Sequence, residues 1–591
     1  MPSSKPSEKA WTQRLTDFLP RALGSEGDDP LQHLQRVSAG ETAIMMLSAL
    51  GIGLVCGLLA IGLNASVHAV RGALGGSEWG PWAILFPAAG MGLAVYLIRS
   101  LMKDFAGHGV SDVIQGMAVG TKSLRRRMIA SRFVGSLLTV GSGGSTGLEG
   151  PIVCVGGAWG TLIGRWLDMN ERRKRLLIGY GVAGAVAGIF NAPLTGLIFT
   201  LEIIVGEYTA LTILPTIIAA VSATEVSRLL AGNKITFHHE IANFSPTSLV
   251  ACIALGVLTG LLSVVFVRSL PWWESVFARL TERLWIRAAT GGLLVGLLGY
   301  WFPEILAEGY VTTQAFLTAE VRPTLLFVLG FVLLKLVACG VTLGSGGVGG
   351  VFAPSLVIGS GVGLAFGMGL QLLPLEGIAE ETAFALTGMT GMVTGVMHGP
   401  LTGIFLVMEA TRGYSLILPL MLTASSAMVV SSYFESGSVY TRELIARGHL
   451  MRRGTDRYLL HTLNIRDILD RDFDILRDTM LLGEFVEVFK HAHRNYFPVV
   501  NKEQQCVGVV FLDDVRSYLF DSQLYPLVTM GTIMRNLPNI DLQEPTDEAL
   551  EKFETSQVWS LPVVENGRFL GMLSKSTLFD HYRRELQIQE T

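Results

Sequence analysis

Charged residues are scarce in this sequence for its length. Only 16% of the 591 residues are Asp, Glu, Lys or Arg, whereas 50% are hydrophobic and the mean hydropathy is +0.46. A typical soluble domain carries about 25% charged residues. The shortage of charge excludes an ordinary soluble protein of this size and predicts a polytopic membrane protein.

Three further features are missing. The five cysteines are scattered, with neither a disulfide framework nor a metal-ligand spacing. The net charge of −4 gives no basic surplus, so we expect no nucleic-acid partner. Residues 1–40 are polar and mixed in charge and contain no secretory signal. We therefore expect 1–40 to be a cytoplasmic N-terminal segment.

Long apolar stretches, rich in glycine at their ends, fill residues 41–450. No charged residue occurs from Thr42 to Val70, which is ample for a helix that spans a membrane. Several later stretches are too short or too glycine-rich for a simple span. We therefore expect an all-α membrane domain whose helices break inside the bilayer around a protected site.

Beyond Tyr440 the composition becomes that of a soluble domain. Within residues 451–591 two similar blocks occur, at about 459–520 and 527–587, each predicted as strand, turn, strand and helix. Tyr496–Val500 and Gly508–Asp514 are matched by Ser560–Val564 and Gly571–Thr577. The tail is therefore predicted to be a tandem α/β domain.

One carboxylate lies in a glycine-rich stretch of the membrane domain. Glu149 follows Gly141–Gly147 and precedes Pro151, a residue suited to the first turn of a helix. The free N–H groups at a helix N-terminus form an anion site, and a carboxylate there either caps the helix or competes with another anion. A phosphate-binding loop is not favoured, because no Lys-Ser/Thr follows the glycines.

The membrane domain also contains an internal repeat. Pro193-Leu-Thr-Gly is matched by Pro400-Leu-Thr-Gly, 207 positions later, and each proline is followed nine residues on by a glutamate. The proline of Glu149-Gly-Pro151 and that of Phe352-Ala-Pro354 are 203 positions apart. Two related halves predict an inverted repeat with a substrate site between them, where Glu149 lies opposite Phe352.

These motifs resemble those of the CLC family of chloride channels and chloride/proton exchangers, some of which are voltage-gated. The resemblance covers about residues 40–447, and the tail resembles a pair of CBS domains. It implies that Glu149 is the external gating glutamate and that Tyr440 coordinates the inner anion. Backbone N–H groups in three loops would bind chloride; these loops contain His108, Gly109 and Val110; Gly150; and Val351, Phe352 and Ala353.

Two positions depart from the family pattern. The first anion loop usually reads Gly-Ser-Gly-Ile-Pro, whereas here it reads Gly107-His108-Gly109-Val110-Ser111. His108 could donate a hydrogen bond to chloride, add pH dependence or point away. The internal proton-carrying glutamate of exchangers is replaced by Ile203, which cannot ionise. Glu207 is a candidate substitute.

Other interpretations remain open for several of these residues. Phe352 could be core packing and Tyr440 an ordinary interfacial tyrosine. Glu202 and Glu409 hold equivalent repeat positions, which favours a structural role at helix ends. Lys335, an isolated membrane cation, is expected to extend its ammonium group to the membrane surface.

Each CBS block keeps half of the family's pattern for adenine nucleotides. Asp514 is present in the first block, where Phe511 replaces the hydroxyl residue. Ser574 is present in the second, where Thr577 replaces the acid. The tail could bind an adenine nucleotide or serve only to brace a dimer.

The sequence thus predicts a chloride transporter, either channel or exchanger, and not an enzyme. We expect no cofactor, with chloride as the transported ligand and protons as a possible second one. The resemblance implies a homodimer with one pathway per subunit. We expect it in the lipid bilayer of a prokaryotic inner membrane, with the CBS domains in the cytoplasm. Alternatives are a CBS-regulated transporter of fluoride, nitrate or a divalent cation, and an intramembrane hydrolase, for which no nucleophile and base are evident.

Overall fold

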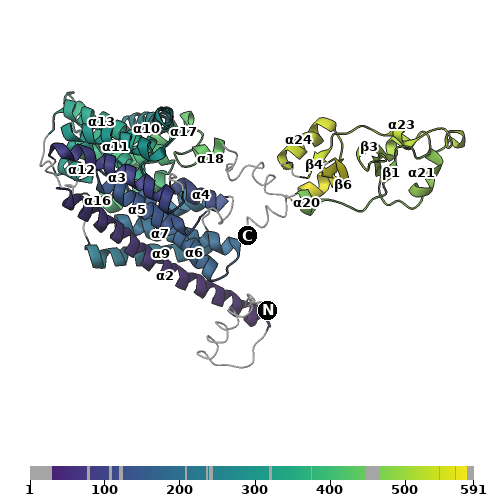
Figure 1. Ribbon diagram of the computed structural model, residues 1–591, viewed down its shortest axis with the longest axis horizontal. Helices are drawn as coiled ribbons and strands as arrows, with labels where there is room; N and C mark the ends of the chain where they lie inside the picture. Colours follow the sequence, from purple (N-terminus) through teal and green to yellow (C-terminus); the bar gives the residue numbers. More distant parts are fainter. Residues whose placement is uncertain are drawn as a thin grey trace. The chain divides into compact units, whose positions relative to one another are not determined.

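The computed structural model describes residues 30–75, 80–104, 109–118, 124–206, 209–233, 237, 244–318, 323–374, 376–446, 465–542, 544, 546–565 and 567–581. The chain divides into two compact units, Met1–Leu450 and Met451–Thr591 (Figure 1). The first is helical throughout its described part. The second combines short strands with helices.

Within the described part of the first unit, seven stretches of helix are long and apolar enough to cross a membrane. They are Thr42–Ala73, Pro81–Leu101, Thr212–Ala231, Pro246–Leu280, Leu325–Gly344, Phe352–Gln371 and Tyr414–Phe434. The helices of this unit are α2 (Pro30–Ala73), α3 (Leu85–Tyr96), α4 (Val110–Ala118), α5 (Arg127–Gly141), α6 (Glu149–Trp166), α7 (Glu171–Phe190), α8 (Pro193–Phe199), α9 (Ala210–Ala231), α10 (Pro246–Leu280), α11 (Leu284–Trp301), α12 (Tyr310–Leu317), α13 (Leu325–Gly344), α14 (Phe352–Gln371), α15 (Glu381–Met397), α16 (Pro400–Thr411), α17 (Ile417–Phe434) and α18 (Arg442–Ala446). Short 3-10 turns η1 (Pro81–Ile84), η5 (Pro303–Ile305) and η6 (Tyr414–Leu416) precede α3, α12 and α17.

Broken helices occur where the sequence predicts them. The apolar stretch from 176 to 204 is divided into α7, the seven-residue α8 and a π-helical turn, η4 (Thr200–Val205). The stretch from 383 to 410 is divided into α15 and α16. A second π-helical turn, η2 (Leu97–Leu101), continues α3.

The two breaks share one backbone conformation. α7 ends at Asn191, which is left-handed with φ 55° and ψ 36°, and α15 ends at His398 with φ 53° and ψ 39°. The next residues, Ala192 and Gly399, are also alike, with φ −134° and −128°. A proline then opens each short helix at its first position, where no N–H donor is needed. The repeat predicted from the sequence is therefore present in the fold.

The two glutamates of the repeat cap each other's helices. The Glu202 carboxylate accepts hydrogen bonds from Leu401 N, Thr402 N and Thr402 Oγ1 at the start of α16, at 3.0, 2.7 and 2.6 Å. The Glu409 carboxylate accepts the equivalent three from Leu194 and Thr195 at the start of α8, at 3.0, 2.7 and 2.7 Å. The structural role expected for both glutamates is confirmed.

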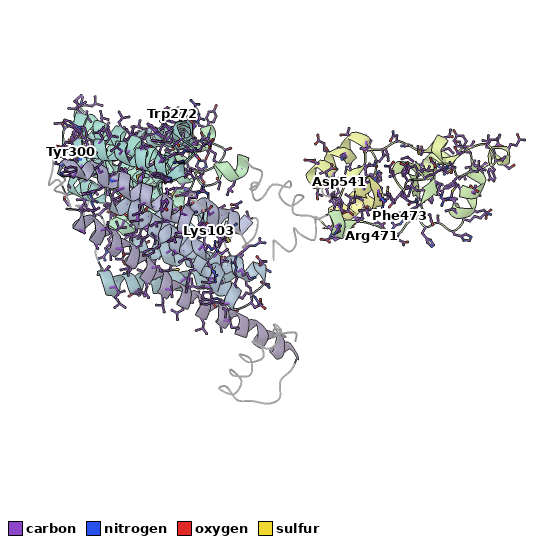
Figure 2. The ribbon with its side chains drawn as sticks, viewed as in Figure 1. Lys103, Trp272, Tyr300, Arg471, Phe473 and Asp541 are labelled. Carbon is purple, nitrogen blue, oxygen red and sulfur yellow. The ribbon has the colours of Figure 1, made fainter. Side chains whose placement is uncertain are left out.

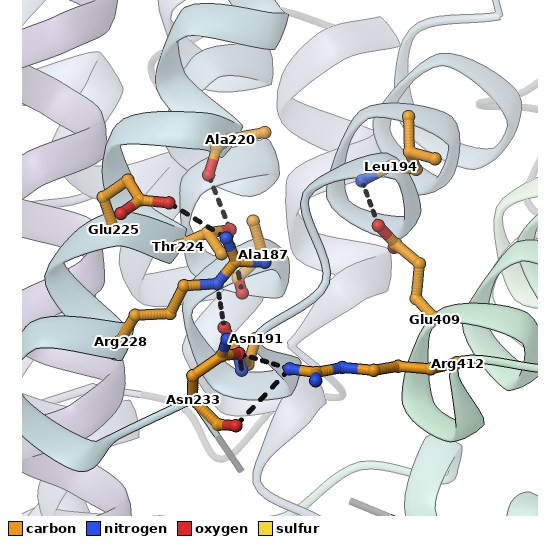
Figure 3. Close-up of polar contacts among 10 residues, drawn as sticks. All are labelled: Ala187, Asn191, Leu194, Ala220, Thr224, Glu225, Arg228, Asn233, Glu409 and Arg412. Carbon is orange, nitrogen blue, oxygen red and sulfur yellow. Dashed lines mark hydrogen bonds and ion pairs between the residues drawn. The ribbon is translucent and has the colours of Figure 1, made fainter. Parts of the chain in front are cut away.

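Figure 3 shows the surroundings of Glu409 where it reaches the N–H group of Leu194. Nearby, Arg228 Nε donates to Asn191 Oδ1 at 3.0 Å, and Asn191 Nδ2 donates to Asn233 Oδ1 at 3.3 Å. Arg412 Nη2 donates to the same Asn233 oxygen at 2.5 Å. The polar chain ties the end of α9 to the end of α16.

Glycine allows neighbouring helices in each half of the repeat to touch backbone to backbone. A Cβ on Gly156 of α6 would lie 2.2 Å from the carbonyl oxygen of Gly181 in α7. A Cβ on Gly359 of α14 would lie 2.4 Å from the carbonyl oxygen of Gly388 in α15. Small residues are used in this way where packing between membrane helices must be close.

Large aromatic side chains lie on the outside of the first unit. Trp272 of α10 and Tyr300 of α11 are labelled at its surface in Figure 2 and are 55% and 42% exposed. Their neighbour Trp301 is 73% exposed. Tryptophan and tyrosine are enriched where a membrane meets water, so these positions suit an interfacial belt.

The described residues of the second unit form two three-stranded sheets of identical topology. Strands β1 (Leu476–Arg477), β2 (Tyr496–Val500) and β3 (Cys506–Phe511) form the first, and β4 (Ile540–Asp541), β5 (Ser560–Glu565) and β6 (Arg568–Ser574) form the second. In each, the first pair is parallel and the second antiparallel. The remaining helices are α20 (Ile465–Ile468), α21 (Leu482–Phe489), α22 (Leu512–Val515), η7 (Ser522–Leu524), α23 (Met530–Ile533) and α24 (Thr546–Ser556).

Candidate anion-binding site

The two glycine-rich loops of the repeat meet directly. Gly147 N donates to Gly350 O at 2.9 Å, and Gly350 N donates to Gly147 O at 2.8 Å. Thr146 Oγ1 adds a bond to Gly350 O at 2.9 Å. Because these two residues are 203 positions apart, each loop is held by its own repeat partner.

Crossed hydrogen bonds reinforce the pairing. Ser145 N donates to Thr342 Oγ1 at 3.1 Å, and Val348 N donates to Thr139 Oγ1 at 3.2 Å. Thr139 and Thr342 are again equivalent residues of the two halves, at the ends of α5 and α13. The loops are thus fixed before α6 and α14 begin.

The starts of three helices come together at this pair of loops. α6 begins at Glu149 and α14 begins at Phe352. A Cβ on Gly150 would lie 3.0 Å from Gly350 Cα. A Cβ on Gly109, whose φ is +66°, would lie only 2.6 Å from Gly150 O, so the segment that opens α4 contacts the start of α6. Helix N-termini present unpaired N–H groups and a positive dipole end, which attract an anion.

Glu149 is the carboxylate at this convergence and is only 2% exposed. Its Oε2 folds back over Gly147, so that a Cβ on Gly147 would lie 2.0 Å from that oxygen and 2.9 Å from the Cβ of Ala353. The backbone N–H groups of Glu149 and Ala353 lie close to the carboxylate but outside hydrogen-bonding geometry. Its Oε1 accepts a hydrogen bond from Tyr310 Oη at 2.7 Å. The carboxylate therefore lies between the two repeat loops.

Phe352 lies at the start of α14, buried at 2% exposure among other aromatic rings. Its ring centroid is 5.2 Å from that of Phe190 and 5.9 Å from that of Phe199. The helix start that corresponds to Glu149 in the other half therefore carries an apolar side chain packed in an aromatic cluster. The neighbouring Val351 and Ala353 are also buried.

Tyr440 is 4% exposed, and its hydroxyl makes no hydrogen bond with any described residue. It lies within electrostatic range of Glu149. A buried hydroxyl usually has a partner, so an unpaired one that is close to a helix-terminus anion site is free to donate to a bound anion.

Of the remaining residues predicted for the site, the structure describes some and leaves others outside the described part. Val110 is buried at the first residue of α4, and Ile203 is half-buried in η4 with its Cδ1 packed toward Gly399. His108 and Glu207 lie outside the described residues. Glu202, beside Ile203, has both oxygens engaged in capping α16.

Sequence reasoning missed one residue at this site and gave a second one the wrong environment. Tyr310 contacts Glu149 from a loop 161 positions away, and no motif marks it. Lys335 was expected to reach the membrane surface, which is wrong, because the side chain is fully buried. Its Nζ donates to Ile305 O at 2.9 Å and Ala307 O at 2.7 Å, since η5 leaves those carbonyls without helical partners.

The two half-motifs of the tail lie in different blocks, with Asp514 in α22 and Ser574 at the end of β6. Asp514 Oδ1 accepts a hydrogen bond from Arg535 Nη2 at 2.5 Å, which raises the pKa of the Arg535 guanidinium. Arg535 also covers the Phe511 ring, with Cζ 5.3 Å from the centroid. Ser574 Oγ is 2.7 Å from Thr577 Oγ1 and accepts from Thr577 N at 3.1 Å.

A family model described as voltage gated chloride channel matches residues 90–432, and a CBS domain model matches residues 465–521 and 530–584. The chain belongs to the CLC family. Curated CLC relatives match about two thirds of the chain. A putative chloride channel protein ClcB-like from Ralstonia nicotianae is 31% identical over 416 residues, which are 68% of this chain and 96% of the relative. An H(+)/Cl(−) exchange transporter ClcA from Vibrio vulnificus is 31% identical over 436 residues, 69% of this chain and 91% of the relative.

One curated relative and one solved structure match about nine tenths of the chain, and a second solved structure matches about two thirds. Chloride channel protein CLC-f from Arabidopsis thaliana is 25% identical over 637 residues, covering 92% of this chain and 81% of its own. A crystal structure of a eukaryotic CLC transporter covers 90% of this chain and 97% of its own at 18% identity, with a TM-score of 0.61. A slow cyanobacterial Cl−/H+ antiporter covers 68% of this chain and 98% of its own at 25% identity, with a TM-score of 0.62. The CLC fold with an appended CBS pair is therefore shown.

Proposed function

We propose that this CLC protein moves chloride across the membrane through a pathway gated by the Glu149 carboxylate. The observation that carries the proposal is the position of that carboxylate, which lies between two paired repeat loops and in front of two helix N-termini. A site that attracts a carboxylate also attracts chloride, because both are bound by N–H groups and a positive dipole end.

The gate works by competition. When Glu149 is ionised, it fills the anion site and excludes chloride. When it is protonated, it loses its attraction to the N–H groups and can leave. Chloride flux should therefore rise as the pH falls. We assign the binding positions to the N–H groups around Gly109, Val110, Gly150, Val351, Phe352 and Ala353, to Tyr440 Oη and, outside the described residues, to His108.

The residues at the internal proton position favour chloride transport that is only loosely coupled to proton movement. Ile203 cannot carry a proton, and the neighbouring Glu202 is committed to three hydrogen bonds. The relatives named as H(+)/Cl(−) exchangers favour retention of some proton movement through Glu149. We therefore expect fewer protons to move per chloride ion than in a tightly coupled exchanger.

The assembly that we propose is a homodimer with one pathway per subunit. Its transport unit comprises residues 41–450, and residues 1–40 and 451–591 lie in the cytoplasm of a prokaryotic cell. Leu194 and Leu401, at the starts of the two reciprocally capped helices, are 39% and 40% exposed and could be covered by a second subunit. Asp514 and Ser574 would contribute to binding an adenine nucleotide only after Arg535 releases Asp514.

The test is a flux measurement on reconstituted full-length protein. Proteoliposomes loaded with chloride are diluted into low chloride, and chloride efflux and proton uptake are recorded together for the native protein and for Ile203→Glu. We expect chloride efflux with weak proton uptake, and a larger proton-to-chloride ratio in Ile203→Glu because an inner carboxylate has been added. Folded protein that releases no chloride would contradict the proposed function, and tight coupling in the native protein would contradict the assignment of Ile203.

A further inference from the structure

A tyrosine from a separate loop holds the Glu149 carboxylate. Tyr310 Oη donates to Glu149 Oε1 at 2.7 Å. Tyr310 is the first residue of α12, and Glu149 is the first residue of α6, so the bond joins the starts of two helices. Glu149 Oε2 accepts no hydrogen bond from a described residue. The phenol is therefore the only described side chain that hydrogen-bonds to this carboxylate.

The loop that carries Tyr310 is fastened from two sides. On one side, the fully buried Lys335 of α13 binds the carbonyls of Ile305 and Ala307, as described above. On the other, Ala307 N donates to Gly143 O at 3.3 Å, in the glycine-rich stretch before Glu149. The loop is thereby tied both to α13 and to the segment that precedes the carboxylate.

The turn into α12 requires a glycine against Lys335. Gly309 is left-handed with φ +89°, and a Cβ there would lie 3.2 Å from Lys335 Nζ and 3.0 Å from Val357 Cγ1. Beyond the turn, the Tyr310 ring meets the buried Phe237 ring edge-on, with centroids 5.6 Å apart. The ring is held by packing and the loop by hydrogen bonds, so the hydroxyl is pre-positioned for the carboxylate.

We propose that Tyr310 is a latch for the gate: its hydroxyl holds the ionised Glu149 in the anion site, and Lys335 is the positioning residue that keeps the latch loop in place. Tyr310 acts in this way only if Glu149 is the gate proposed above. A hydrogen bond donated to a carboxylate stabilises its ionised form, so the latch lowers the pH at which the gate opens. Chloride must break this bond as well as displace the carboxylate.

Other ionisable groups lie near the latch. Glu308, in the same loop, and Tyr440 are within electrostatic range of Glu149. Lys335 and Arg71 are in turn within range of Glu308. Tyr310→Phe is therefore the decisive variant, because it changes the hydroxyl alone and leaves these charges in place, whereas Lys335→Met also removes one of them.

The experiment measures chloride efflux from proteoliposomes against pH for the native full-length protein and three variants. Tyr310→Phe should move the pH of half-maximal flux upward by about one unit, the effect of losing one hydrogen bond to a charged group. Tyr180→Phe is the matched control, because Tyr180 is also buried in the membrane domain and its hydroxyl has no hydrogen-bond partner among the described residues. It should leave the profile unchanged. Lys335→Met should shift the profile in the same direction as Tyr310→Phe, by a smaller amount.

A Tyr310→Phe profile that coincides with the native one, or that shifts downward, would overturn the latch. If Lys335→Met does not fold, Tyr310→Phe alone decides whether the latch exists. This variant removes one oxygen atom and keeps the packing of the ring. A fourth variant, Glu149→Gln, separates the two proposals. If Glu149→Gln abolishes the pH dependence and Tyr310→Phe has no effect, only the latch fails. If the pH dependence survives in Glu149→Gln, the gate itself is wrong.

Discussion

The two halves of the membrane domain have nearly the same backbone but different chemistry at one position. Asn191 and His398 share a left-handed conformation, and Glu202 and Glu409 cap each other's helices through the same three hydrogen bonds. At the equivalent helix starts, however, one half has Glu149 and the other Phe352. The comparison teaches that the repeat builds two equivalent helix starts, and under the proposed function this one asymmetric pair makes the anion site a gated one.

The largest effect is expected where the two loops touch. A Cβ on Gly350 would lie 2.6 Å from Gly150 N, and neither backbone can yield because Gly147 and Gly350 are hydrogen-bonded. We expect Gly350→Ala to abolish chloride efflux and lower the yield of folded protein. Gly330→Ala is the control, because a Cβ there meets nothing within 4 Å. Normal flux in Gly350→Ala would mean that loop pairing is not required.

A substitution at Phe352 should sharpen the contrast between the halves. Phe352→Leu shortens the side chain beside the anion site and leaves the Glu149 carboxylate in place. We expect chloride flux to increase by about two- to fivefold, equivalent to less than about 1 kcal/mol in the barrier, with its pH dependence retained. A proteoliposome assay at several pH values checks this. Loss of the pH dependence would show that gating is shared between the halves.

The reciprocal caps should be equivalent in energy. Glu202→Gln and Glu409→Gln each weaken a carboxylate that accepts three hydrogen bonds, and each should lower the free energy of unfolding by about 1–2 kcal/mol. Thermal unfolding in detergent compares the two directly. Unequal losses would show that the symmetry of the fold does not extend to its stability. A change in the proton-to-chloride ratio in Glu202→Gln alone would give Glu202 a role in proton transfer.

The smallest effect is expected in the CBS pair. Asp514→Asn breaks a half-exposed ion pair with Arg535, and such pairs contribute about 0.5 kcal/mol. Unfolding of the full-length protein should therefore change little, while titration with ATP shows whether loss of the Asp514 carboxylate weakens nucleotide binding. The matched change in the other block is Ser574→Ala. If both variants bind as the native protein does, neither half-motif contributes to a nucleotide site.

Much of this architecture follows from local patterns. The Pro-Leu-Thr-Gly repeat predicted the paired broken helices, and the shared offset near 203 predicted that Glu149 and Phe352 face each other. Lys335 and Tyr310 could not be predicted in the same way. Their partners are the carbonyls of a turn and a carboxylate 161 positions distant, and neither leaves a spacing in the sequence. Lys335 also breaks the general expectation for membrane lysines, because η5 supplies buried oxygens that replace water.

The most direct test of the central claim is the pH profile of chloride efflux in Glu149→Gln. Glutamine keeps the shape of the side chain but cannot ionise, so it cannot compete with chloride as an anion. In the native protein, flux should rise as the pH falls. In Glu149→Gln it should be high and independent of pH. A Glu149→Gln protein whose flux still rises on acidification as the native flux does would contradict the assignment of Glu149 as the gate.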